Sequence, residues 1–344
     1  MCTKNKYRIE RADGKVFFAF ARKDYDVEEF YTKDELYRKM YKVEKIPCGY
    51  CWQCKKKKAK EWAFRGVKEK QYHDKSFMIT LTYDDEHLPK TQYIDKQTGE
   101  LITTSTLKRD DQRQFIKNIR KKLGNNLKIL GCGEYGSDKD YVDWRGNKRK
   151  GSERPHYHII IMGNVPKDLK FWTYSKCEWS KQKNKLYRSK SMSDSWGKGH
   201  ADINEVNKET IEYVCRYTTK KLYGDAGKEV YDKKNRYVPY LVSSKGFGKQ
   251  YYEDNKDKFW NEEKHFLLTK KGVEEIDHPG RYFDKLMKAE DEAQFEKLKA
   301  GRTKKAEEYW NDLISKTDLT KIEYIENLDQ KENAKARRMK RTLR

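Results

Sequence analysis

The sequence has no apolar stretch near the roughly 20 residues that a membrane-spanning helix needs, and its first residues, MCTKNKYRIE, are polar, unlike a secretory signal. It also has no GxxxxGK[ST] phosphate-binding loop, which argues against ATP hydrolysis of the Walker type. Its seven cysteines form no even disulfide framework. We therefore expect a protein of a reducing cytoplasm, whose cysteines are free or bound to metal.

Apolar residues are scarce, at 35% of the 344 residues, and charged residues make up 39%. The 25 Tyr, 13 Phe and 8 Trp residues still supply large buried areas, so a core is expected in the middle of the chain. The net charge of +23 attracts polyanions, and aromatic residues lie among the lysines and arginines, where they could stack on bases. This combination favours nucleic acid as the partner, against the alternative of a generally lysine-rich proteome.

Turn signals and residue periodicity predict the order of the main elements. Residues 7–20 predict a β-hairpin, and residues 86–105 predict a loop or small hairpin. The highly charged sequence from about residue 284 is helix-prone. Together with the strands and helices below, this order predicts an α+β protein with an antiparallel sheet flanked by helices. Strands are predicted over 77–85, 127–136 and 199–206, with helices over 106–124, capped at Ser105 or Thr106, and over 208–222.

The segment ERPHYHIIIMG, residues 153–163, has His156 and His158 two positions apart at the start of an apolar strand. Successive side chains of a strand point to opposite faces, so both imidazoles share one face. Two such histidines form half of a metal site, or else they are ordinary polar residues on a solvated face. Glu134 ends the preceding strand, and its carboxylate could complete a three-ligand site open to water or substrate.

The predicted helix over 208–222 has two distinct faces. At about 100° per residue, one face collects an apolar core stripe, and the other collects tyrosine and basic residues. Tyr213 and Tyr217 are neighbours one turn apart, and core packing does not explain them because the apolar stripe is already filled. A solvated tyrosine face is the alternative. The apolar stripe consists of Ile211, Val214, Cys215, Thr218 and Leu222, and the opposite face of Tyr213, Arg216, Tyr217 and Lys220.

Cys48, Cys51 and Cys54 have C-x₂-C-x₂-C spacing, and three thiolates this close could bind Zn²⁺ with a fourth ligand from elsewhere. An iron–sulfur cluster is less favoured, because position 58 is Lys and no fourth cysteine follows closely. Alternatively, the cysteines are three small residues at the start of a basic helix. The residues predicted to contact DNA phosphates are Lys55, Lys56, Lys57, Lys58, Arg65 and Arg154.

Five motifs occur in order between about residues 47 and 252: PCGYCWQC, MITLTYDD, GEYG followed by RPHYH, WGKGHADINEV leading to YVCRYTTKK, and LVSSKGFGKQYY. With them, the sequence resembles the replication initiators of gokushovirus-type microviruses, which are small phages with circular single-stranded DNA. Those initiators are HUH endonucleases, named for a His–hydrophobic–His motif that His156-Tyr157-His158 matches. The resemblance implies a ferredoxin-like or RRM-like antiparallel sheet of the HUH type, with the histidine pair on its central strands.

The resemblance also implies a tyrosine transesterification. A tyrosine attacks a phosphate of single-stranded origin DNA, which leaves a 5′-phosphotyrosine and a free 3′-OH, and the circular product is later religated. A phenol is mostly neutral at pH 7 and needs activation, and a divalent cation neutralises the phosphate. The residues that the resemblance assigns are Tyr213 and Tyr217 as nucleophiles, Lys220 and Arg216 as cations that stabilise the phenolate, and His156, His158 and Glu134 as ligands of Mg²⁺ or Mn²⁺.

On this basis, four segments are expected: an N-terminal hairpin with a cysteine-containing basic segment (1–75), the HUH endonuclease core (76–225), a Gly/Ser loop with an accessory segment (226–283), and a charged helical tail (284–344). The expected partners are single-stranded viral origin DNA and a host helicase and DNA polymerase, in the cytoplasm of a bacterial host. Two alternatives are a relaxase or transposase of the same chemistry, and a non-enzymatic nucleic-acid-binding protein with a structural metal.

Overall fold

The computed structural model divides the chain into two compact units, one made of residues 1–57 and 298–343 and the other of residues 58–297 with residue 344. The residues that the structure describes are 6–20, 35–136, 141–142, 148–149, 151, 153–176, 183–220, 227–269, 272–319, 323–328, 330–331 and 334. The side chains of residues 217–220 are not among those described. No helix within these ranges is long and apolar enough to cross a bilayer.

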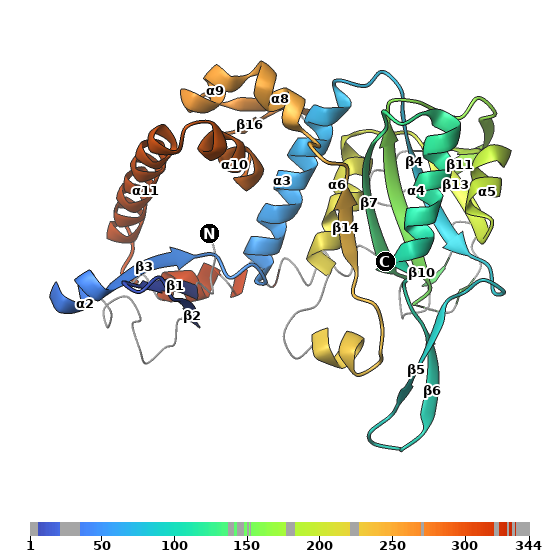
Figure 1. Ribbon diagram of the computed structural model, residues 1–344, viewed down its shortest axis with the longest axis horizontal. Coiled ribbons are helices and arrows are strands. Elements are labelled where there is room, and N and C mark those ends of the chain that lie inside the picture. Colours follow the sequence, from blue (N-terminus) through green and yellow to red (C-terminus); the bar gives the residue numbers. More distant parts are fainter. Residues whose placement is uncertain are drawn as a thin grey trace. The chain divides into compact units, whose positions relative to one another are not determined.

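The unit of residues 58–297 is built on a seven-stranded sheet with the strand order β11-β12-β13-β4-β10-β7-β14, in which every pair is antiparallel (Figure 1). Strand β10 lies between β4 and β7, so the histidine strand is central. The mixed helix and antiparallel-sheet class predicted from the sequence is confirmed. The strands are β4 (Ser76–Tyr83), β7 (Lys128–Tyr135), β10 (Pro155–Met162), β11 (Lys170–Lys176), β12 (Lys183–Arg188), β13 (Gly199–Asn204) and β14 (Tyr240–Ser243).

A ferredoxin-like unit lies at the centre of this sheet. The chain runs through β4, α4 (Arg109–Leu123), β7, β10, α5 (Lys190–Trp196) and β13, which is a β-α-β-β-α-β order. In the sheet these four strands are adjacent in the order β13-β4-β10-β7. The second helix of the unit is therefore α5, and the predicted helix over 208–222, observed as α6 (Lys208–Lys220), follows the unit.

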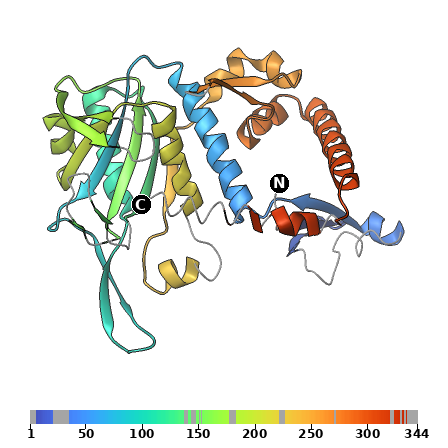
Figure 2. The ribbon, with the colours of Figure 1, turned by 180° about the vertical axis from the view of Figure 1, so that it is seen from behind.

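The two faces of the sheet are covered by different helices. Alternate residues of β4 and β10, such as Ile79 and Ile159, pack in one core with Phe115 of α4 and Met192 of α5. The residues between them pack in a second core with α6 and with α3 (Trp52–Lys70), and Figure 2 shows these two helices side by side. The predicted core stripe of α6 is confirmed for the side chains that are described: Ile211, Val214 and Cys215 are fully buried.

Gly66 allows α3 to approach α6 closely. A Cβ atom built on Gly66 would lie 2.5 Å from Cγ2 of Ile211, which is fully buried and cannot move aside. Ala usually stabilises an open helix position relative to Gly by about 1 kcal/mol. At this position we expect Gly66→Ala to lower the free energy of unfolding by about 1–3 kcal/mol, because the extra methyl overpacks the core.

Urea denaturation of the purified protein measures this effect, and Gly301→Ala is the matched control. Gly301 lies in α11 (Glu292–Ser315), and a Cβ atom there would have no neighbour within 4 Å. The control should therefore be as stable as the wild type or more stable. A Gly66→Ala protein with unchanged stability would show that α3 and α6 do not pack this closely.

Three long connections leave the sheet at one end. They join β4 to α4 (residues 84–108), β7 to β10 (136–154) and α6 to β14 (221–239). The strand register brings these attachment points together, since Tyr135 is opposite Pro155 and Gly133 is opposite Tyr240. The first connection carries the hairpin of β5 (Lys90–Ile94) and β6 (Leu101–Ser105), which Figure 1 shows extending away from the sheet. The hairpin expected within residues 86–105 is thus confirmed.

The predicted start of α4 is wrong. The helix begins at Arg109, and the residue before it, Lys108, makes no side-chain cap. Ser105 ends β6, and the hydroxyl of Thr106 accepts a hydrogen bond from the backbone N–H of Tyr237, so neither residue caps the helix. The predicted end at Gly124 is confirmed.

The remaining elements of this unit follow β14, and the other unit contains a small sheet. They are α8 (Lys249–Asp254), α9 (Lys256–Trp260), the hairpin of β15 (His265–Thr269) and β16 (Gly272–Ile276), and α10 (Arg281–Glu290). In the other unit, the predicted N-terminal hairpin of β1 (Lys6–Arg11) and β2 (Val16–Phe20) is confirmed. It is extended by β3 (Tyr41–Ile46), which pairs with β1 and follows α2 (Glu35–Met40).

Candidate metal centre and active site

The strand register brings Glu134, His156 and His158 together. His156 is directly opposite Glu134 of β7, and His158 is opposite Thr80 of β4. Directly opposite residues of antiparallel neighbours lie on the same face of a sheet. Because the residues between them belong to the core under α4, all three side chains lie on the face that α6 covers in part.

The distances within this group fit one metal ion. Nε2 of His156 lies 2.8 Å from Oε1 of Glu134, and Nε2 of His158 lies 3.3 Å from the same oxygen. Adjacent ligands of an octahedral ion with bonds of about 2.1 Å are about 3 Å apart. Glu134 and His158 are buried, with 4% and 5% of their surfaces exposed. A buried carboxylate is costly unless a positive charge compensates it, so this site favours a cation.

The far side of each imidazole ring is also held in place. Nδ1 of His156 donates a hydrogen bond to the carbonyl oxygen of Arg154 at 3.0 Å, and Nδ1 of His158 lies 3.0 Å from Oγ1 of Thr80. Metal-binding histidines commonly have such contacts on the second nitrogen. Since Arg154 O can only accept, a neutral His156 ring directs a lone pair at Glu134. A positive charge must then lie between the ring and the carboxylate, either as a second ring proton or as a metal ion.

Tyr213 lies next to this group. Its ring centroid is 5.1 Å from that of His158, in an edge-to-face arrangement, and 38% of its surface is exposed. Its phenol is thus near the three ligands and accessible to a substrate. Arg216, on the same helix, has its guanidinium 3.8 Å from the carboxylate of Glu212. The backbones of Tyr217 and Lys220 belong to α6, but their side chains lie outside the described residues.

Tyr157, the middle residue of the motif, points to the other face and is fully buried. Its hydroxyl donates a hydrogen bond to the carbonyl oxygen of Lys108 and lies 2.8 Å from that of Tyr83, which donates to Asp111. Burial raises the pKa of Tyr157 to about 12 and also raises the pKa of Tyr83. Both groups therefore stay protonated at neutral pH and hold β10 in place.

Comparison with known proteins assigns the part of the chain that carries these residues. Residues 76–222 match the family model of the replication-associated protein ORF2. This segment belongs to that family. The match contains Glu134, His156, His158 and Tyr213, and we call it the replication domain. The predicted resemblance to phage replication proteins is confirmed.

Three relatives are replication-associated proteins of viruses that infect bacteria. ORF2 of Spiroplasma virus 4 is 29% identical over 310 residues, which cover 88% of this chain and 86% of the relative. VP4 of Bdellovibrio phage phiMH2K is 31% identical over 52% of this chain, and ORF4 of Chlamydia phage 1 is 30% identical over 51%. These two matches span 49% and 38% of the relatives' own lengths. No solved structure gives a significant match.

The predicted DNA contact of Arg65 is corrected by the structure, since its guanidinium is used inside the protein. Arg65 is only 8% exposed, and it donates two hydrogen bonds to the carbonyl oxygen of Phe247. Its guanidinium carbon also lies 4.0 Å from the ring centroid of Trp62 and 3.7 Å from that of Tyr282. Arg65 therefore attaches the glycine-containing loop after β14 to helix α3.

The other predicted DNA-binding residues occupy different environments. Lys56, Lys57 and Lys58 are exposed near the start of α3, and Lys55 is half-buried. The side chain of Arg154 pairs with Asp85, while its carbonyl oxygen orients His156. A phosphate contact of the lysines or of Arg154 stays a prediction. Cys48, Cys51 and Cys54 also lie together, in the unit that contains the N-terminal sheet.

An aromatic and basic pair on the same face of the replication domain was missed in the sequence. The guanidinium carbon of Arg188 lies 3.6 Å from the ring centroid of Trp172, and its Nε lies 3.5 Å from Asp202. Asp202 is opposite Thr80, the partner of His158, so this pair shares the face of the metal ligands. The register shift between Phe171 and Thr173 breaks the alternation that would have revealed the pair. The aromatic run KFWTYSK was the available signal.

Proposed function

We propose that this replication-associated protein initiates rolling-circle replication by cutting one strand of the viral origin, with Tyr213 as a nucleophile beside a metal bound to Glu134, His156 and His158. The observation that supports it most is the convergence of three metal-type ligands with an accessible phenol, whose ring is 5.1 Å from His158. A basic protein of net charge +23 would also attract the DNA.

In the proposed reaction, Oη of the tyrosine attacks the scissile phosphorus, and the bond from phosphorus to the 3′ oxygen breaks. The electron pair of that bond goes to the 3′ oxygen, which takes up a proton, while the phenol gives up its own proton. The products are a 5′-phosphotyrosine and a free 3′-OH. A bound Mg²⁺ or Mn²⁺ would neutralise the phosphate charge and polarise the reacting bond. Arg216 and Lys220 would stabilise the phenolate.

Religation would follow by the reverse step. Tyr217 lies one helical turn from Tyr213, so it would cut the regenerated origin while Tyr213 still holds the first strand. The free 3′-OH then attacks the phosphotyrosine and closes the circle. A host polymerase would extend the 3′-OH, and a host helicase would unwind the duplex, because the sequence has no Walker-type loop.

The test is a denaturing gel of the purified protein with labelled single-stranded origin oligonucleotide. We expect a covalent protein–DNA adduct with Mg²⁺ or Mn²⁺ and none in chelator. A non-enzymatic binding protein would instead retard the oligonucleotide on a native gel and form no adduct with either ion. Undiminished cleavage in chelator would exclude the metal-assisted mechanism.

We also propose that Trp172 stacks on a base of the bound strand. Trp172 and Arg188 lie toward the sheet edge, and the three strand spacings from β12 to β10 amount to about 14 Å. Stacking of one base on an aromatic ring contributes about 1–3 kcal/mol. Trp172→Ala should therefore weaken binding of single-stranded DNA by about 5- to 150-fold, measured by fluorescence anisotropy.

Phe171→Ala is the matched control for this prediction. Phe171 belongs to the same strand and is 54% exposed, but it is paired with Tyr187, on the face of the sheet that α4 and α5 cover. The control should bind DNA like the wild type. Equal losses in both variants would indicate damage to β11 in place of a lost stacking contact.

A further inference from the structure

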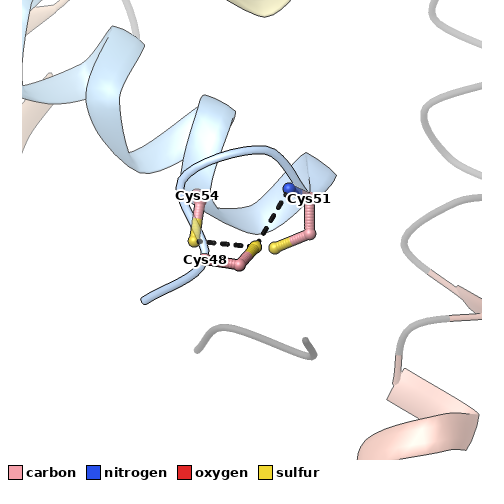
Figure 3. A group of neighbouring side chains, drawn as sticks. All are labelled: Cys48, Cys51 and Cys54. Atoms are coloured by element: carbon pink, nitrogen blue, oxygen red, sulfur yellow. Dashed lines mark hydrogen bonds between the residues drawn. The ribbon is translucent and has the colours of Figure 1, made fainter. Parts of the chain in front are cut away.

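Three cysteines converge where the small sheet joins helix α3. Cys48 follows β3, Cys51 immediately precedes α3, and Cys54 lies in its first turn. Their sulfur atoms all lie within 4.8 Å of one another, and Sγ of Cys48 is 4.0 Å from Sγ of Cys54 (Figure 3). Four sulfurs around a zinc ion with bonds of about 2.3 Å are about 3.8 Å apart. The spacing therefore fits ligands of a single tetrahedral ion.

The surrounding backbone also favours thiolates. The N–H of Cys51 donates a hydrogen bond to Sγ of Cys48 at 3.3 Å, which Figure 3 shows as a dashed line. Gly49, between them, has a φ of +83°, a left-handed conformation that glycine adopts without strain and that makes this close turn possible. The positive end of the dipole of the 19-residue helix α3 lies at the same point and stabilises negative sulfur.

A disulfide, an iron–sulfur cluster and plain core packing each fit the three cysteines less well. A disulfide would join two of the three sulfurs at about 2.05 Å and would leave the third unexplained. In an iron–sulfur cluster each thiolate binds a different iron atom, so the sulfurs would be farther apart than those that share one ion. Ordinary core packing does not require three sulfur atoms to face one another. Cys48 and Cys51 are each only 7% exposed, which suits a closed structural site.

We propose that Cys48, Cys51 and Cys54 bind one structural Zn²⁺ ion as thiolates, with a fourth ligand completing the tetrahedron. The ion would fix the end of β3 to the start of α3 and so orient the exposed lysines that follow at positions 56–58. This inference goes beyond the proposed function, because no step of strand cleavage uses the cysteines.

The experiment measures zinc in the full-length protein, purified under reducing conditions without chelator, by mass spectrometry of the metal. We expect about one zinc per chain in the wild type and in the His156→Ala, His158→Ala double variant, whose candidate catalytic site is disabled. Cys54→Ser should lose the zinc, and Cys54→His should retain it, because imidazole is a zinc ligand and a hydroxyl is a poor one.

A far-ultraviolet circular dichroism spectrum of each variant separates loss of the ion from loss of the fold. The wild type should also release its zinc stoichiometrically when a mercurial reagent titrates the thiols, which needs no variant. Absence of zinc in the wild type, iron in its place, or zinc that disappears only in the histidine double variant would each overturn the proposal. A failure of nicking with one cysteine-bound zinc present would contradict only the proposed function.

Discussion

Glu134→Gln is expected to reduce strand cleavage by about 10³-fold or more while the protein keeps its fold and its affinity for single-stranded DNA. Gln has nearly the shape of Glu, but it lacks the negative charge that both imidazoles face. A metal ion contributes several kcal/mol to the stabilisation of the transition state, and about 4 kcal/mol corresponds to a factor of 10³. DNA affinity should persist because it depends mainly on contacts of lysine and arginine with phosphates.

Single-turnover cleavage of a labelled origin oligonucleotide, titrated with Mn²⁺, measures this loss. His156→Ala and His158→Ala should behave in the same way as Glu134→Gln. His87→Ala is the matched control, because His87 is exposed and contacts Asp84, outside the metal group. If Glu134→Gln cleaved at the wild-type rate, this carboxylate would not be a metal ligand.

The double variant Tyr213→Phe, Tyr217→Phe is expected to fold, bind DNA and form no covalent adduct. Phe keeps the ring that packs edge-to-face on His158 and removes only the nucleophilic oxygen. Removal of a nucleophile typically costs far more than about 10³-fold in rate, so the adduct should fall below detection. Tyr213→Phe alone should affect the first cut more than Tyr217→Phe, and each single variant should lose efficient strand closure because closure needs the second hydroxyl.

Peptide mapping of the protein–DNA adduct tests this assignment at the level of the residue. Tyr309→Phe serves as the control, since Tyr309 is 63% exposed on α11 and belongs to the other unit. An adduct found on any residue other than Tyr213 or Tyr217 would overturn the proposed nucleophiles, even if the protein proved to be a nickase.

Local periodicity was enough to predict the parts of the candidate site that lie on single elements. The two-residue period of a strand predicted that His156 and His158 share a face, and the helical period predicted that Tyr213 lies opposite the core stripe of α6. The pairing of His156 with Glu134 is different in kind, because a long connection separates their strands. Only the packing of the whole sheet fixes that register.

Arg65 and Trp172 show why charge and composition alone misassign residues. The lysine-rich run before Arg65 suggested a DNA contact, but Tyr282 and Phe247, far along the chain, enclose its guanidinium. Trp172 received no role from the sequence because a bulge in β11 interrupts the alternation of that strand. In both cases the deciding neighbours come from other elements, and no local pattern contains them.

The three long connections all begin and end beside the metal ligands, at the end of the sheet where Glu134 and His156 lie. At the opposite end, shorter turns such as those from α4 to β7 and from β13 to α6 maintain the strand pairing. Such a division lets the lengths and sequences of residues 84–108, 136–154 and 221–239 change without altering the register that holds the ligands. Origin preference and chemistry are therefore separable traits in this fold, so an altered choice of cutting site requires no change in the machinery that cuts.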